Sequence, residues 1–250
     1  MRPPSEDREF ADRADRRFES LAKPYHGRRK GVESDSQPGW PLPTPKGRNG
    51  NNEDEYLVGT TADRHVELER IVRADAQLMR LLEVGRDVNL PQWRLVAGCI
   101  YQTVWNTLTD RPRGTGINDY DFIYFDDRDL SKAAENVAEF KVRELLPDLP
   151  APVEVRNQAR VHLWFEDYFD IPYTPLTCAD EAIDRYASKT HAVGIRLTDD
   201  GLLDVYAPFG LEDIFAMIMR PNYALPNKPT HDRKAGRAKA IWPGLRVLAW

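Results

Sequence analysis

Two aspartates separated by a single residue, Asp119 and Asp121, begin the most strand-like run of the chain, which continues to Phe125. Side chains alternate between the faces of a strand, so both carboxylates leave the same face, roughly 7 Å apart at Cβ. Such a pair suits magnesium, a hard cation that takes few protein ligands and leaves positions open for phosphate oxygens. The alternative interpretation is a pair of solvated aspartates at the start of a strand.

A glycine between a predicted strand and a predicted helix supplies a second chemical feature. Residues 94–98 are expected to form a short buried strand that runs directly into a helix over residues 99–108. The free N–H groups and the dipole at the start of that helix favour phosphate. Gly98 lets a phosphate approach the backbone closely, and Cys99 follows it. The alternative is a tight turn that binds no ligand.

A third acid, Glu154, lies between two valines in a short predicted strand over residues 152–155. It should project away from the valines, toward a solvated face. With the two aspartates it could complete a two-metal site. It could instead act as a general base, or be an ordinary exposed strand residue.

Helices and strands alternate along the part of the chain that carries these acids. A helix is predicted from apolar residues at three-and-four spacing and is expected to end at Gly85, and a second helix is predicted over residues 130–146. Asp200-Gly201 predicts a hairpin between residues 191–197 and 202–206, and a hairpin implies antiparallel pairing. The expected fold class is therefore α+β, a mixed or mainly antiparallel sheet flanked by helices.

The composition predicts two parts. Residues 1–55 are charged and rich in proline and glycine, so they cannot bury enough apolar surface to offset their ordering entropy. They are expected to be a disordered polar arm, in which Trp40 and Leu42 are the apolar exceptions. Residues 60–250 are expected to form the folded domain.

Charge and hydropathy restrict the partners and the location. The net charge of −5 gives no reason to expect nucleic acid as an obligate partner, and the basic stretch from His231 to Lys239 is interpreted as a solvated helix face. No stretch approaches the roughly 20 apolar residues that a membrane helix needs. Two cysteines, Cys99 and Cys178, fit a reducing compartment, so the protein is expected to be cytoplasmic.

The glycine, the acid-x-acid strand and the third acid resemble the signature of the DNA polymerase β-like nucleotidyltransferase superfamily. More closely, the chain resembles a bacterial family of uncharacterised nucleotidyltransferase-like proteins over roughly residues 60–250. The stretches that carry this resemblance are Val96-Ala-Gly-Cys-Ile100, Asp119-Tyr-Asp-Phe-Ile-Tyr-Phe-Asp126, Val155-Arg-Asn-Gln-Ala-Arg-Val-His162, Ala192-Val-Gly-Ile-Arg-Leu197 and Ala207-Pro-Phe-Gly-Leu211.

The resemblance implies transfer of a nucleoside monophosphate from an NTP to an unidentified acceptor: a small molecule, a protein or RNA. Asp119, Asp121 and Glu154 would be catalytic and would hold Mg²⁺, or Mn²⁺ in its place. Gly98 and Cys99 would bind the phosphates, mainly through backbone amides, because Cys99 stands where many members have serine. Arg160 could reach the triphosphate if its segment is helical.

Two other functions fit the same motifs. A nucleotide-binding or antitoxin-like protein could retain the fold without turnover. A metal-dependent glycosyltransferase also uses Asp-x-Asp to hold a nucleotide diphosphate, although the early strand-to-helix turn at Gly98 argues against it.

Overall fold

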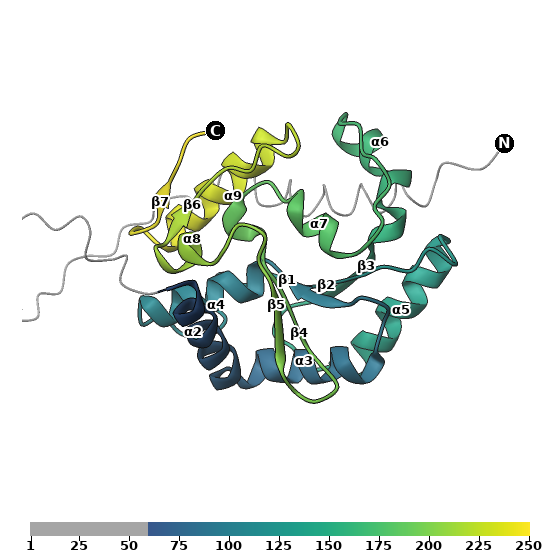
Figure 1. Ribbon diagram of the computed structural model, residues 1–250, viewed down its shortest axis with the longest axis horizontal. Helices are drawn as coiled ribbons and strands as arrows, with labels where there is room; N and C mark the ends of the chain where they lie inside the picture. The colour runs from purple at the N-terminus through teal and green to yellow at the C-terminus, as the bar shows by residue number, and fades with distance from the viewer. Residues whose placement is uncertain (1–59) are drawn as a thin grey trace, which may run out of the picture. The chain divides into compact units, whose positions relative to one another are not determined.

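The computed structural model describes residues 60–250, so the predicted arm over residues 1–55 lies outside the described residues. The described part is built on a mixed sheet of five strands in the order β3-β2-β1-β4-β5 (Figure 1). Strands β2 and β3 are parallel, and the other neighbours are antiparallel. The predicted α+β class with a mixed sheet is confirmed.

The strands of the main sheet lie at or near the expected positions, and a small second sheet follows them. Their bounds are β1 (Arg94–Val96), β2 (Tyr120–Tyr124), β3 (Val153–Asn157), β4 (Gly194–Leu197), β5 (Leu203–Tyr206), β6 (Ile218–Met219) and β7 (Arg246–Val247). Strands β4 and β5 form the predicted hairpin around Asp200-Gly201.

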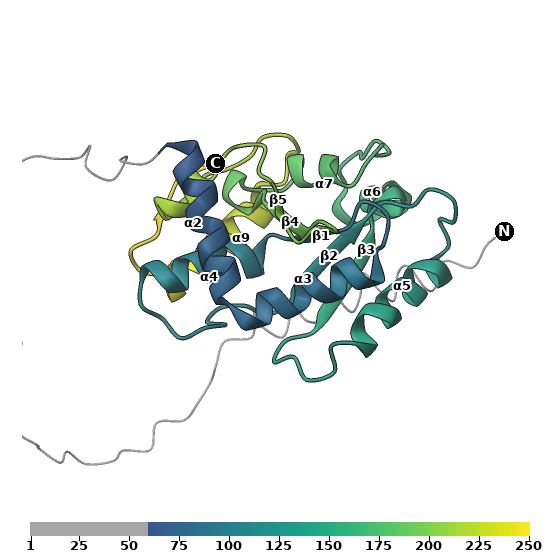
Figure 2. The ribbon, with the colours of Figure 1, turned by 60° about the horizontal axis from the view of Figure 1, so that its bottom comes forward.

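Helices lie on both faces of this sheet. Figures 1 and 2 show α3 and α5 together on one face, while α7 and α9 lie on the other. The helix bounds are α2 (Thr61–Ala74), α3 (Ala76–Val88), α4 (Gly98–Leu108), α5 (Lys132–Glu144), α6 (Phe165–Phe169), α7 (Asp180–Asp184), α8 (Glu212–Phe215) and α9 (Lys228–Ile241), with 3₁₀ helices η2 (Gln158–Leu163) and η3 (Lys189–His191). No helix in this described part is both long and apolar enough to cross a membrane.

The first predicted helix is two helices in the structure. Asp75 ends α2 and caps α3, because its carboxylate accepts hydrogen bonds from the amides of Gln77 and Leu78, each at 3.0 Å. The expected end at Gly85 is wrong. A Cβ there would lie 2.4 Å from the ring of Trp93, so this glycine permits close packing inside α3, which continues to Val88.

The sheet separates an apolar face from a polar face. Leu95, Phe122 and Val155 lie in register on one face and are almost fully buried. Phe122 packs against Trp93, which contacts α3, so this face holds the core beneath α3 and α5. Asp121 and Glu154 lie on the opposite face, which is the side of α7 and α9.

Candidate active site

The register of the sheet brings the three predicted acids to one place. Asp119 immediately precedes β2, and Asp121 is the second residue of β2. Asp121 is the direct neighbour of Glu154 on parallel strand β3. Adjacent strands lie about 4.8 Å apart. Two residues that are 33 positions apart in the chain therefore have neighbouring side chains on the same face.

The start of α4 lies at the same edge of the sheet. Strand β1 is antiparallel to β2, with Val96 opposite Asp121, so the chain leaves β1 where it enters β2. Gly98, the first residue of α4, follows Val96 by two positions, and Asp119 precedes Asp121 by two. The pairing thus places the helix N-terminus beside the carboxylates, as the sequence predicts.

The carboxylates influence one another electrostatically. The pKa of Asp121 is raised to about 7, mainly by desolvation and then by the charges of Asp119 and Glu154. Lys234 and Arg156 act in the opposite direction. Like charges that are held together in a partly desolvated site create a demand for a cation.

Glu154 is engaged with a neighbouring cation in this structure. Its Oε2 lies 3.1 Å from a guanidinium nitrogen of Arg156, which also contacts Glu139 at 2.8 Å. Within residues 60–250, no group of three or more His, Cys, Asp or Glu side chains is already arranged to hold a metal ion. The carboxylates supply the hard oxygen donors that magnesium prefers, and Glu154 would have to exchange its partner to serve as a third ligand.

The N-terminus of α4 begins from a strained residue and has no side-chain cap. Ala97 has φ 56° and ψ −113°, a conformation that residues with a Cβ rarely adopt. Within residues 60–250, no side-chain cap hydrogen bond reaches the first amides of the helix. Strain of this kind, at 1–3 kcal/mol by common estimates, persists where the surroundings impose it, often at ligand sites.

Gly98 has open space beside it. Its φ is not positive, and the nearest non-local atom to a Cβ built there would be Nε2 of Gln102, at 3.7 Å. Neither backbone conformation nor protein packing therefore requires glycine at this position. The amide of Gln102 is buried, and its Oε1 has no hydrogen-bond partner among the residues that the structure describes. An unpaired polar atom next to an uncapped helix start is a feature that a bound polar ligand or water would explain.

The side chain of Cys99 points into the protein. It is 1% exposed, and Sγ lies 3.6 Å from the carbonyl oxygen of Val96. Burial raises the pKa of this thiol, and the charges of Asp121 and Asp119 raise it further. The thiol is therefore neutral and directed to the backbone, so the group of Cys99 that remains available to a ligand is its backbone amide.

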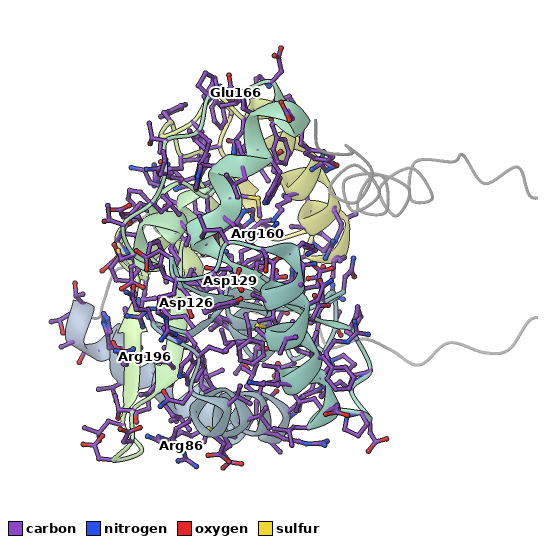
Figure 3. The ribbon with its side chains drawn as sticks, turned by 90° about the vertical axis from the view of Figure 1, so that its right-hand side faces the viewer. Arg86, Asp126, Asp129, Arg160, Glu166 and Arg196 are labelled. Carbon is purple, nitrogen blue, oxygen red and sulfur yellow. The ribbon has the colours of Figure 1, made fainter. Side chains whose placement is uncertain are left out.

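Arg160 is engaged with α5 and with the connection that precedes this helix. Its guanidinium is buried, pairs with Glu135 of α5 at 2.7 Å and donates to the carbonyl of Leu130 at 3.2 Å. Figure 3 labels Arg160 together with Asp126 and Asp129, which belong to the connection between β2 and α5. Residues 158–163 are helical, as the prediction required, but as a 3₁₀ helix, in which Arg160 pairs with Glu135 of α5.

The charged residue that sequence reasoning missed is Lys234 of α9. The stretch around it was interpreted as a solvated face, yet His231, Ala235 and Ala238 are buried. The charge of Lys234 acts on Asp121 and on Asp119. The recurrence of histidine and alanine at helical spacing within the basic stretch is the signal that could have indicated a packed face.

Comparisons with known proteins are consistent with this geometry. Residues 83–247 match the model of a protein family described as "Nucleotidyltransferase". A solved NMR structure, described as revealing a CCA-adding enzyme head domain, aligns with a TM-score of 0.58 at 27% identity, covering 74% of this chain and 96% of that chain. Among curated proteins, none matches this sequence significantly. Gly98 and all three acids lie within the matched range.

Proposed function

Because the chain belongs to the nucleotidyltransferase family, we propose that its transfer of a nucleoside monophosphate depends on magnesium held by Asp119 and Asp121. The observation that carries this proposal is the sheet register, which groups Asp119, Asp121 and Glu154 beside the uncapped start of α4. The family match gives no support to the glycosyltransferase alternative.

Each part of the site has a distinct role in this proposal. The amides of Gly98 and Cys99 bind the phosphates of an NTP at the positive end of the α4 dipole. Asp119 and Asp121 hold the metal, and Glu154 either completes its ligand set or accepts the proton of the acceptor. When bound, magnesium would neutralise the grouped carboxylates and the charge that develops on the phosphates.

The reaction makes one bond and breaks one. An oxygen of the acceptor, or a similar nucleophile, forms a bond to the α-phosphorus of the NTP while the bond to the bridging oxygen of the β-phosphate breaks. Pyrophosphate leaves, and the acceptor proton passes to Glu154 or to solvent. The acceptor is a small molecule, a protein or RNA.

A transfer assay tests the proposal. The full chain is incubated with each of the four α-labelled NTPs, with Mg²⁺ or Mn²⁺, in the presence of cell extract or transfer RNA, and pyrophosphate release is measured. We expect release with at least one NTP, loss of release on chelation, and no release by Asp121→Asn. Nucleotide binding without pyrophosphate release under every condition would favour the catalytically inactive binding protein instead.

A further inference from the structure

The helix α9 is attached to the protein on both sides of Lys234. On one side, Nδ1 of His231 is 2.7 Å from the hydroxyl of Ser188, and Nε2 is 3.1 Å from the carbonyl of Leu248. On the other side, Arg237 donates to the carbonyl of Gly116 at 2.8 Å. Gly116 lies three residues before Asp119, so α9 runs alongside the segment that leads into the acid-x-acid strand.

Helical geometry then determines where Lys234 lies. It is three residues from His231 and three from Arg237, and residues three apart share a helix face. Lys234 therefore lies on the face of α9 that these two residues attach to the protein. Consistent with this position, the charges of Asp121 and Asp119 act on the Lys234 ammonium.

Lys234 has no direct partner in the described part of the chain, whereas other basic residues of its helix do. Lys228 forms an ion pair with Asp232, and Lys239 donates to the carbonyls of Pro243 and Leu245. Among residues 60–250, no ion pair or hydrogen bond engages Lys234. Its side chain is exposed by surface area, although the surrounding protein desolvates it enough to lower its pKa.

From this placement, and resting on the proposed function, we infer that Lys234 is a mobile counter-ion with two alternative partners. Without metal, its ammonium balances the charge of Asp119 and Asp121. With magnesium bound to the aspartates, that attraction is cancelled, and the ammonium instead binds the phosphates of the incoming NTP beside the start of α4. A lysine suits this exchange because its compact charge sits on a flexible four-carbon stem.

The inference predicts opposite changes in two affinities. Removing the charge with Lys234→Met removes a competitor for the aspartates, so the affinity for Mg²⁺ alone should rise by about threefold to tenfold. The same variant loses a charge-assisted contact to phosphate, so the affinity for phosphates in the presence of Mg²⁺ should fall by about tenfold or more. A lysine that only supports the fold would not produce this pair of opposite effects.

The experiment uses the full chain and two probes, Mg²⁺ alone and inorganic tripolyphosphate with saturating Mg²⁺, both measured by calorimetry. Lys228→Met is the matched control, because Lys228 lies on the same helix and pairs locally with Asp232; it should change neither affinity. Lys234→Arg should restore tripolyphosphate binding, and thermal melts of all variants establish that they are folded.

Two sets of outcomes keep this inference separate from the proposed function. Unchanged affinities in Lys234→Met, or affinities that change in the same direction, would overturn the inference whatever the transfer assay shows. Opposite changes support it even if no NTP is turned over, since neither probe carries a base or an acceptor. In that case only the proposed transfer activity fails.

Discussion

At the scale of single residues, the site is a concentration of negative charge that the folded chain tolerates without neutralising it fully. Desolvation and two neighbouring carboxylates raise the pKa of Asp121, and the cations that oppose this effect, Lys234 and Arg156, do not restore its ordinary value. The folded state therefore carries an electrostatic cost at neutral pH that a divalent cation would remove.

Removing one of these charges should affect the free protein and the ligand complex differently. We expect Asp121→Asn to leave the thermal stability of the free protein unchanged or slightly higher, because the raised pKa means that its carboxylate is unfavourable when ionised. At ligand concentrations a hundredfold above Kd, the free energy of unfolding of the wild type should rise by about 2.7 kcal/mol, and the variant should lose most of that increase. Thermal melts with and without Mg²⁺ and NTP measure both effects.

Asp127→Asn serves as the control for this substitution, because Asp127 is exposed and lies beyond the end of β2. It should behave like wild type with and without ligand. If Asp121→Asn kept the full ligand-induced shift, the metal site would lie elsewhere. If it destabilised the free protein as well, the carboxylate would have a structural role.

A second residue-scale prediction concerns pH. His191 is 1% exposed, stacks on Tyr101 at 5.0 Å, and has no hydrogen-bond partner for either ring nitrogen among the described residues. Burial lowers its pKa well below 6.5, and the charges of Lys234, His231 and Arg237 lower it further. The unfolded chain therefore binds a proton below about pH 6.5 that the folded chain rejects.

The contribution of neutral His191 to stability is fully present above the pKa that this histidine has in the unfolded chain. It is lost as the pH falls below that pKa. Relative to its value at neutral pH, the free energy of unfolding should drop by about 2 kcal/mol at pH 5 from this group alone. His191→Phe keeps the ring stacking and removes the titration, so urea unfolding should show a shallower pH dependence. An identical slope in the variant and in wild type would contradict the assignment.

At the scale of elements, the junction of β1 and α4 is organised around the free start of a helix. The backbone turns sharply at Ala97, and Gly98 leaves space beside the first amides that no protein atom fills. A helix whose N-terminus has no side-chain cap contributes less to stability than a capped helix would. A free helix start of this kind fits the phosphate binding that we propose.

Gly98→Ala separates binding from folding at this junction. A Cβ there would meet nothing closer than 3.7 Å, so the free energy of unfolding should stay the same or rise by up to about 1 kcal/mol. The methyl group occupies the space of a phosphate, so affinity for NTP with Mg²⁺ should fall by about tenfold or more. Chemical denaturation and calorimetry give the two values.

Gly236→Ala is the matched control, because this glycine lies within α9 and a Cβ there would meet no atom within 4 Å. It should raise stability to a similar degree and leave nucleotide affinity unchanged. Unaltered affinity in Gly98→Ala would exclude the start of α4 as the phosphate site.

At the scale of the whole molecule, a buried ionic network connects the sheet to its covering helix. Glu135 of α5 forms ion pairs with Arg160 and Lys132, each at 2.7 Å. It also accepts a hydrogen bond from the backbone amide of Asn157 at 2.9 Å. It therefore joins the end of β3 to α5. Such networks are costly to break, because removing one member leaves a buried charge less well compensated.

Arg160→Met should therefore destabilise the protein by about 3–5 kcal/mol and leave NTP affinity within about twofold of wild type. Urea unfolding and calorimetry below the unfolding temperature test both parts. The double variant Arg160→Met with Glu135→Leu should recover part of the loss, because it removes the buried carboxylate that has lost its arginine partner. A stable Arg160→Met variant with impaired NTP binding would instead place Arg160 at the triphosphate, as the sequence suggested.

Local patterns were sufficient to predict much of the fold and part of the site. Alternating and helical periodicities located β2, α4, α5 and the β4–β5 hairpin, because each depends on neighbours close in sequence. The two-residue spacing of Asp119 and Asp121 and the glycine before α4 have chemical meaning without a tertiary structure. The carboxylate pair and the glycine turn before α4 can therefore be identified from the sequence.

The tertiary structure decided which distant groups become neighbours. Register alone pairs Asp121 with Glu154, the packing of α4 turns the thiol of Cys99 inward, and the docking of α5 engages Arg160. Lys234 approaches the aspartates because α9, more than a hundred residues later, is attached at His231 and Arg237. The free energy of these contacts depends on surfaces that exist only after folding, so no local pattern encodes them.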